Sequence, residues 1–345
     1  MPSVSDELFP VDPKKLHLKP QHAWRVGIGA GILGAILVAL KYALRPPTKR
    51  RVPDAISPPV FTTKVRHTSL GQVVYHESGS GQPLVFVHNV GFGASSYEWS
   101  KVYPEFVARH RVIALDLIGF GESARPAVRL TAADCVRTLA EFLRSFEWEQ
   151  PPILVASGWS AGLCVYLATQ HPELVSRLIL HMPNGAGEVG SHSLPFFSQW
   201  LYRTPLLARF LYRNQLSTRS SVAHWLRKAV LLDPSAATEE MIDVMATCAQ
   251  QPSAEHAALA WLGGSLSFDL EARLRLLLRP MALLWGEEST AEPEGRAFHL
   301  QRLVPASPLT VISNGGIMAA LETPEAMVAA LDEQLRADLR ILKAS

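Results

Sequence analysis

The feature that most constrains the fold is a series of short apolar segments that alternate with helix-like segments after residue 60. Each apolar segment is six to nine residues long and carries few charges: PLVFVHNV (83–90), RVIALDL (111–117), PPILVASGW (151–159), VSRLILHM (175–182), RPMALLWG (279–286) and PLTVIS (308–313). Strands of this composition are typical of a parallel sheet that helices cover on both faces. We therefore expect an α/β domain.

A short motif lies between one predicted strand and the next predicted helix. GWSAG, Gly158–Gly162, fits the G-x-S-x-G turn that carries a serine nucleophile, and its glycines let the chain turn sharply. Four further segments belong to the same pattern: VFVHNVGFGASSYEW, VIALDLIGFGES, LLWGEES and GGIMAALETPEAM. Over about residues 62–340 the chain thus resembles the α/β-hydrolase fold, in the branch that inserts a helical cap after the sixth strand.

The resemblance implies a serine mechanism, in which a histidine takes the proton of the serine and backbone N–H groups hold the developing oxyanion. On this interpretation Ser160 is the nucleophile, and the N–H groups of Val90 and Ala161 form the oxyanion hole. Asn89 replaces the glycine that the family usually has after His88. Asparagine tolerates left-handed backbone angles better than most residues, which is compatible with the loop.

The other two catalytic positions are degenerate. The resemblance places the histidine at residue 317, which is Ile317, and no histidine occurs in residues 300–345. It places the acid at Ser289, and the nearest alternative, at the end of the sixth strand, is the uncharged Asn184. A serine hydroxyl without a base is a poor nucleophile, so we expect Ser160 to be vestigial and ordinary serine-hydrolase activity to be absent.

A relocated base is the main alternative. His88 follows a predicted strand near the nucleophile turn, although in the family its role is to shape the oxyanion loop. His192, His224 and His256 lie in the predicted cap, where surface or packing roles are the simpler interpretation, and His181 ends a buried strand. With such a base the chain would be a membrane-bound hydrolase of lipid or other apolar esters.

An uncharged apolar segment precedes the domain. Residues 26–40 read VGIGAGILGAILVAL, and extension to 24–44 gives about 31 Å of helix, enough for a hydrocarbon core of about 30 Å. Arg25 and Lys41 would then lie at the two interfaces. A signal peptide fits less well, because a polar stretch of 25 residues comes first and no small-residue cleavage site follows. We predict a single-pass transmembrane helix.

The predicted helix carries a small-residue face. Gly27, Gly31, Ala35 and Ala39 recur at steps of four, so another helix could pack closely there, either from another membrane protein or from a second copy. The lysines and arginines after the helix are slightly denser than those before it, which favours a cytoplasmic location of the large domain. The chain then divides into a tail (1–23), the transmembrane helix (24–44), a proline-rich linker (45–60), the hydrolase core (61–186 and 263–345) and the cap (187–262).

The cap sequence is basic and aromatic. Residues 189–232 contain no aspartate or glutamate, but they include Arg203, Arg209 and Arg213 among several aromatic side chains. This composition fits a surface on anionic lipid headgroups. Aromatic side chains that fill the interface between cap and core, with solvated arginines outside, are an equally good interpretation.

Composition narrows the function. The net charge of +2 argues against nucleic-acid binding, and the three scattered cysteines show neither a disulfide framework nor metal-ligand spacing. We expect no cofactor. The favoured hypothesis is a membrane-anchored, non-catalytic α/β-hydrolase-like protein that serves as an accessory or stabilising subunit of a membrane complex, with a possible apolar ligand in the old pocket.

Overall fold

The computed structural model describes residues 60–185, 204–287 and 294–344, together with residues 34, 35, 38, 49, 50 and 52. The chain divides into two units, Met1–Arg45 and Pro46–Ser345, and nearly all of the described residues belong to the second. The predicted transmembrane helix, residues 24–44, lies almost wholly outside the described residues. Within the described part of the chain, no helix is long and apolar enough to cross a bilayer.

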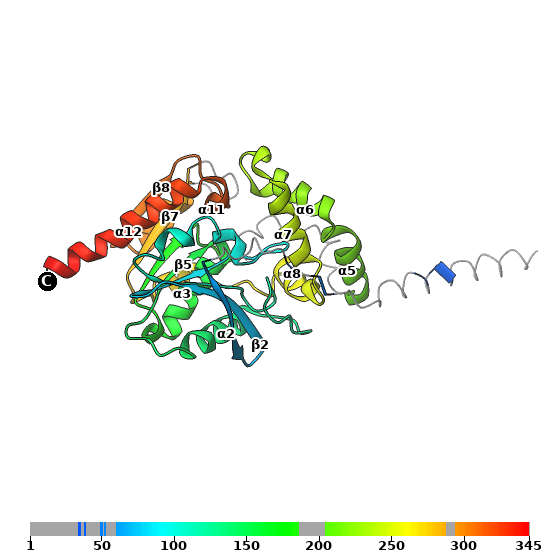
Figure 1. Ribbon diagram of the computed structural model, residues 1–345, viewed down its shortest axis with the longest axis horizontal. Helices are drawn as coiled ribbons and strands as arrows, with labels where there is room; N and C mark the ends of the chain where they lie inside the picture. Colours follow the sequence, from blue (N-terminus) through cyan, green and yellow to red (C-terminus); the bar gives the residue numbers. More distant parts are fainter. Residues whose placement is uncertain are drawn as a thin grey trace, which may run out of the picture. The chain divides into compact units, whose positions relative to one another are not determined.

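An eight-stranded sheet forms the centre of the second unit (Figure 1), in the order β1-β2-β4-β3-β5-β6-β7-β8. The first two strands form an antiparallel hairpin, β2 is antiparallel to β4, and all later neighbours are parallel. The strands are β1 (Thr62–Thr68), β2 (Gly71–Ser78), β3 (Pro83–Val87), β4 (Arg111–Leu115), β5 (Ile153–Ser157), β6 (Arg177–His181), β7 (Met281–Gly286) and β8 (Leu309–Ile312). The predicted α/β class is confirmed.

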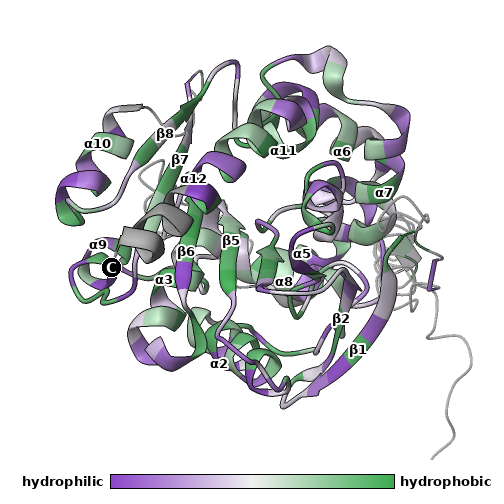
Figure 2. Cartoon of the chain, turned by 60° about the vertical axis from the view of Figure 1, so that its left-hand side comes forward, coloured by the Kyte–Doolittle hydropathy of each residue, from purple (hydrophilic) through white to green (hydrophobic). Residues whose placement is uncertain are grey.

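Helices cover both faces of the sheet, which explains why its strands are so apolar (Figure 2). Alternate residues of β3 point to opposite faces: Val85 and Val87 join one buried cluster, and Leu84 and Phe86 join the other. The covering elements are α2 (Ala132–Arg144), α3 (Gly158–Gln170), α9 (Leu270–Leu274) and α10 (Glu294–Leu303) on the first face, and the turns Ser96–Trp99 and Tyr103–Phe106 with α11 (Ala319–Glu322) and α12 (Pro324–Ala344) on the second.

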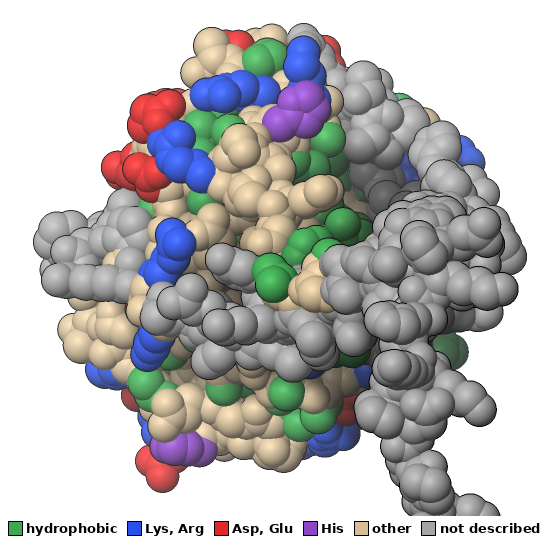
Figure 3. Space-filling model, turned by 90° about the vertical axis from the view of Figure 1, so that its right-hand side faces the viewer, with side chains coloured by type: hydrophobic (Ala, Val, Ile, Leu, Met, Phe, Trp, Pro, Cys, Tyr) green, Lys and Arg blue, Asp and Glu red, His purple; other side chains and the backbone are tan. Residues whose placement is uncertain are grey.

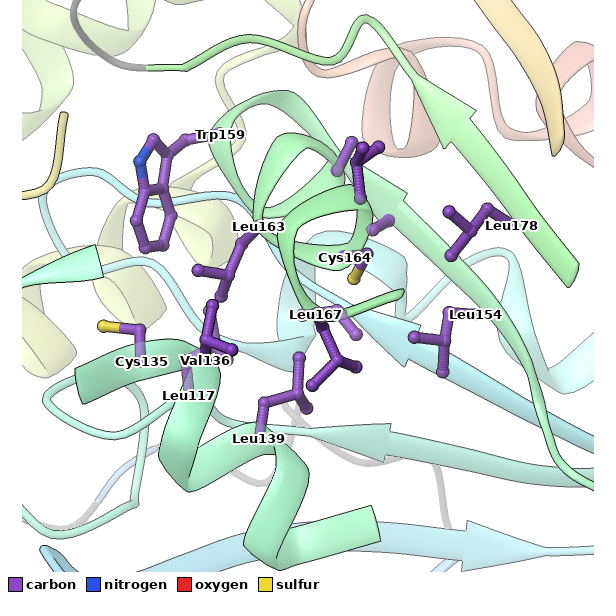
Figure 4. Close-up of a cluster of buried hydrophobic side chains, with 14 of the residues drawn as sticks. Leu117, Cys135, Val136, Leu139, Leu154, Trp159, Leu163, Cys164, Leu167 and Leu178 are labelled. Atoms are coloured by element: carbon purple, nitrogen blue, oxygen red, sulfur yellow. The ribbon is translucent and has the colours of Figure 1, made fainter. Parts of the chain in front are cut away.

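The helix α3 lies at the heart of the first cluster (Figure 4). Its Leu163, Cys164 and Leu167 are buried beside Leu154 of β5 and Leu178 of β6. The three cysteines of the chain are free and buried, as expected for thiols that only pack. This close packing fixes the start of α3 against the carboxyl ends of the strands, where the candidate site lies.

The cap follows β6, as the sequence predicts. Its helices group together beside the sheet (Figure 1): α5 (Pro205–Leu211), α6 (Arg219–Trp225), α7 (Glu239–Ala249) and α8 (Ala254–Leu262). A third buried cluster joins them to the core, because Phe92 and Tyr97 from the loop after β3 pack among cap residues such as Val222 and Met245. The aromatic residues at this interface agree with one of the two interpretations of the cap sequence.

Candidate functional site at the turn between β5 and α3

The turn from β5 into α3 is where this fold presents a nucleophile. Ser157 is the last residue of β5 and the N-cap of α3, and Gly158 is the first residue of the helix. Gly158 has a φ of 53°, in the left-handed region, so the sharp change of direction occurs there. The residue at the turn therefore has no side chain.

The assignment of this turn to Ser160 is wrong by two residues. Ser160 is the third residue of α3 and is fully buried, and its Oγ has no hydrogen-bond partner. Ala161, the expected oxyanion donor, is also fully buried within the helix. The first glycine of GWSAG, Gly158, is itself the turn residue. The sequence therefore fits the motif, but its serine lies two residues beyond the position at which this fold presents a nucleophile.

The oxyanion hole is present but is filled by the chain itself. In this fold its donors are the N–H after the turn residue and an N–H from the loop after β3. Here they belong to Trp159 and Val90, and both donate to Oδ1 of Asn89, at 2.9 and 2.8 Å. Two N–H donors require an acceptor, which identifies the oxygen of the carboxamide. Val90 is thus at the expected place, and Trp159 replaces Ala161.

The Asn89 side chain also occupies the space that a nucleophile would need. A Cβ placed on Gly158 would lie 2.2 Å from Nδ2 and 2.4 Å from Cγ of Asn89, well inside van der Waals contact. Asn89 in this position therefore requires glycine at residue 158. The pair explains physically why Asn89 stands where the family usually has glycine, since its carboxamide satisfies donors that would otherwise lack a partner.

The expected base and acid positions carry no catalytic group in the described residues. Ile317 lies on the wall of the cavity described below, so the predicted histidine position is at the site but bears an aliphatic side chain. Asn184 also lines the cavity, and its N–H donates to the carbonyl of Gly158 at 3.1 Å. Ser289 lies outside the described residues.

The contacts of His88 do not fit the alternative in which it is the base, and they agree with a role in shaping the oxyanion loop. Its Nε2 accepts from the N–H of Leu117 at 3.0 Å, so the proton is on Nδ1, which donates to the carbonyl of Asn89 at 2.5 Å. Burial lowers the pKa of the His88 imidazole, and the ring is fully buried. Both nitrogens are used to shape the loop.

The other candidate histidines that the structure describes also do not line the cavity. His181 is buried at the end of β6, and burial lowers its pKa to about 4. His224 is exposed on α6, and Nε2 of His256 lies 2.8 Å from the guanidinium of Arg209. His192 lies outside the described residues. None of the described histidines can take a proton at the turn.

A cavity of about 240 Å³ lies between the cap and the turn. Its wall is mostly apolar and includes three methionines and the aromatic residues Tyr97, Trp159, Trp225 and Trp261. The cavity lies at the turn where the family places its active site, and an apolar ligand in it stays a prediction.

One buried carboxyl group lies on the cavity wall, and the sequence analysis missed it. Glu98 accepts from the N–H of Asn89 at 2.6 Å through Oε2 and from the hydroxyl of Ser157 through Oε1. Burial raises the pKa of Glu98 to about 7. No sequence signal distinguished this glutamate from the solvated acids on neighbouring turns, because only the fold brings it beneath the oxyanion loop.

The basic residues of the cap have acidic neighbours in space. Arg209 and Arg213 both contact Oε1 of the buried Glu255, at 3.4 and 2.6 Å. Farther along the cap, Arg219 pairs with acidic residues of α7. Figure 3, which views the molecule from the right-hand side of Figure 1, shows basic and acidic side chains close together in its upper part. Arg203 lies outside the described residues, and a lipid-binding role for these arginines stays a prediction.

The comparisons with known proteins agree with the fold. The family model described as "alpha/beta hydrolase fold" matches residues 82–324. The chain is 28% identical over 257 residues to 2-hydroxy-6-oxo-6-(2'-aminophenyl)hexa-2,4-dienoic acid hydrolase of Metapseudomonas resinovorans, covering 73% of this chain and 83% of that protein. It is 24% identical over 273 residues to 2-hydroxy-6-oxo-2,4-heptadienoate hydrolase of Pseudomonas putida, covering 76% and 92%.

Solved structures with the same fold superpose on the chain. A serine hydrolase involved in carbazole degradation superposes with a TM-score of 0.64 and 23% identity, covering 80% of this chain and 99% of that one. An esterase from Thermogutta terrifontis gives a TM-score of 0.65 and 20% identity, covering 80% and 98%. With the strand order, the cap after β6 and a family match over most of its length, the chain belongs to the alpha/beta hydrolase fold family.

Proposed function

We propose that this chain is a non-catalytic member of its family, which binds a small apolar molecule in the cavity beneath its cap. One observation carries the proposal: the carboxamide oxygen of Asn89 accepts from both N–H groups that would hold an oxyanion, those of Val90 and Trp159. Catalysis of acyl transfer depends on donors that are free for the charge that develops in the transition state. Here the chain uses them in its ground state.

The lack of a nucleophile at the turn supports the same conclusion. Gly158 offers no hydroxyl, Ser160 is buried inside α3 without a base, and Ile317 offers no imidazole. Three requirements of the serine mechanism therefore fail together at one site. A cavity with a largely apolar wall is kept in front of them, which favours a binding role for what remains.

The alternative is a serine hydrolase with a rearranged base, which the named activities of the relatives favour. A fluorophosphonate probe applied to the purified chain separates the two proposals, because it reacts covalently with activated serines. We expect no labelling, while an active serine hydrolase added to the same sample is labelled. Labelling that disappears in Ser160→Ala, or in a Ser95→Ala variant of the cavity wall, would overturn the non-catalytic proposal.

The membrane role is a second part of the proposal and depends on the sequence alone. We propose that residues 24–44 anchor the chain as a single-pass protein, with the large domain on the cytoplasmic side. The small-residue face of Gly27, Gly31, Ala35 and Ala39 would dock on a helix of a partner complex or of a second copy.

Gentle detergent extraction followed by native electrophoresis tests the docking. We expect migration well above the mass of the monomer, and we expect Gly31→Leu to shift the chain toward the monomer because a bulky side chain holds the helices apart. Ile32→Leu, on another face of the predicted helix, is the matched control and should not shift it. A wild-type chain that migrates only as a monomer would count against an accessory-subunit role.

A further inference from the structure

The described residues that line the cavity include one acidic side chain and no basic side chain. Among the side chains of residues 60–185, 204–287 and 294–344 that line the cavity, Glu98 is the only carboxyl group, and no lysine, arginine or histidine is present. Its partners are a backbone N–H and a hydroxyl, which are both neutral. No basic side chain of the described residues forms an ion pair with it. An ionised Glu98 is therefore a buried charge without a counter-charge, which is a costly arrangement.

The rest of the wall favours positive charge. Trp225 and Trp261 line the cavity with partly buried side chains, and the face of an indole attracts a cation. The donors that would have stabilised an anion, the N–H groups of Val90 and Trp159, are both taken by Asn89. An anionic ligand would thus meet a carboxyl group of like charge and would find these two donors occupied.

We propose that the cavity selects a small organic cation, a protonated amine on an apolar body, whose ammonium group pairs with Glu98 while its body lies among the tryptophans. This inference rests on the proposed function, because it takes the cavity to be a binding site rather than a catalytic one. The ligand supplies the positive charge that the wall lacks, and a charge-assisted hydrogen bond to a buried carboxylate is strong. The cavity volume of about 240 Å³ limits the ligand to a small molecule.

Three molecules of the same shape test the proposal on the full-length chain in detergent at pH 8. They are 3-phenylpropylamine, 3-phenylpropanol and 3-phenylpropionate, and each affinity is measured from the quenching of tryptophan fluorescence, with calorimetry as a check. We expect the amine to bind about tenfold more tightly than the alcohol, and the carboxylate to bind most weakly. The measured quantity is the ratio of the affinities of amine and alcohol.

Two variants assign the ratio to one carboxyl group. Glu98→Gln keeps the size and an acceptor oxygen but removes the charge, so the ratio should fall to about one. Glu240→Gln is the matched control: Glu240 accepts from the hydroxyl of Tyr97 but does not line the cavity, so the ratio should stay at its wild-type value. Circular dichroism verifies that both variants fold.

Several outcomes would overturn the proposal. They are a ratio that survives in Glu98→Gln, a carboxylate that binds as tightly as the amine, and an absence of saturable binding by all three molecules. In each case Glu98 would serve only to hold the oxyanion loop. These failures are distinct from failure of the non-catalytic part of the proposed function, which serine labelling tests: a chain that binds none of the three molecules and resists the phosphonate still lacks an activated serine.

Discussion

The interior of the sheet and its carboxyl edge meet the requirements of a serine hydrolase to very different degrees. In β3 and β5 every residue is buried, and alternate side chains enter the two clusters as a hydrolase sheet requires. A few residues farther on, Asn89 fills the oxyanion hole and Gly158 replaces a nucleophile. The comparison teaches that packing and chemistry are separate demands in this fold: the strands pack as the fold requires, while the described edge presents a glycine at the turn and oxyanion donors that Asn89 already occupies.

The largest expected effect tests the framework. Phe86 is fully buried and contacts Trp99, Tyr103 and Phe106 on the second face of the sheet. Phe86→Ala should lower the free energy of unfolding by about 4 kcal/mol, because it removes apolar contacts and leaves a cavity. Phe298, 45% exposed on α10, is the control, and its replacement by alanine should cost less than about 0.5 kcal/mol. Urea unfolding measures both, and equal losses would contradict the packing described here.

The second prediction concerns the contact between Gly158 and Asn89 at the carboxyl edge of the sheet. Gly158→Ala adds a methyl group against the Asn89 carboxamide and should cost about 3 kcal/mol. Gly264→Ala is the matched control, since Gly264 also has a left-handed φ, of 75°, but a Cβ there would make only an ordinary contact of 3.7 Å with Oγ of Ser267, so it should cost about 1 kcal/mol.

Asn89→Gly provides the test of this explanation. In a double-mutant cycle, the removal of the carboxamide should reduce the cost of Gly158→Ala to about the 1 kcal/mol of the control. If the two substitutions are simply additive in urea unfolding, the Asn89 side chain does not fill the site as described.

The third prediction uses the pKa of Glu98, which burial raises to about 7 from an ordinary value near 4.5. A raised pKa means that the folded chain holds the proton more tightly. The stabilisation is therefore fully present below pH 4.5 and is lost as the pH rises through 7. Relative to Glu98→Gln, the wild type should lose about 2 kcal/mol between pH 5 and pH 8. Parallel urea titrations at several pH values measure it, and curves that keep a constant separation would show that Glu98 is not buried as described.

The smallest effect belongs to the position expected for the base. Ile317 is only partly buried on the cavity wall, so Ile317→His should change stability by less than about 1 kcal/mol. It should also give no fluorophosphonate labelling, because Gly158 still offers no hydroxyl and Asn89 still fills the hole. Labelling of this single variant would contradict the contrast between the sheet interior and its carboxyl edge, since it would show that the site at this edge lacks only a histidine.

The sequence was sufficient for the framework because the framework depends on patterns along the chain. Apolar runs such as PLVFV and ILVAS predict buried parallel strands. The long interval between VSRLILHM and RPMALLWG indicates an inserted cap. Prediction of the site requires the end of β5 to be known more precisely than to within two residues. Ser157 ends β5, so the turn is at Gly158, but the letters of GWSAG place Ser160 at the centre of the motif.

The function of Asn89 was beyond the sequence for a related reason. The substitution of glycine by asparagine after His88 was visible, but the sequence suggested only that the backbone could tolerate it. The two donors that the side chain satisfies come from Val90, next to it, and from Trp159, 70 residues away. Only the folded sheet brings β3 and β5 side by side and so makes one carboxamide the partner of both.

The contact between Asn89 and Gly158 also bears on how a reactive turn could be rebuilt in this chain. A side chain at residue 158 would collide with the carboxamide of Asn89 in its present position. A serine introduced there alone would therefore have to displace that carboxamide, so Gly158→Ser and Asn89→Gly are needed together to place a hydroxyl beside two unoccupied N–H donors.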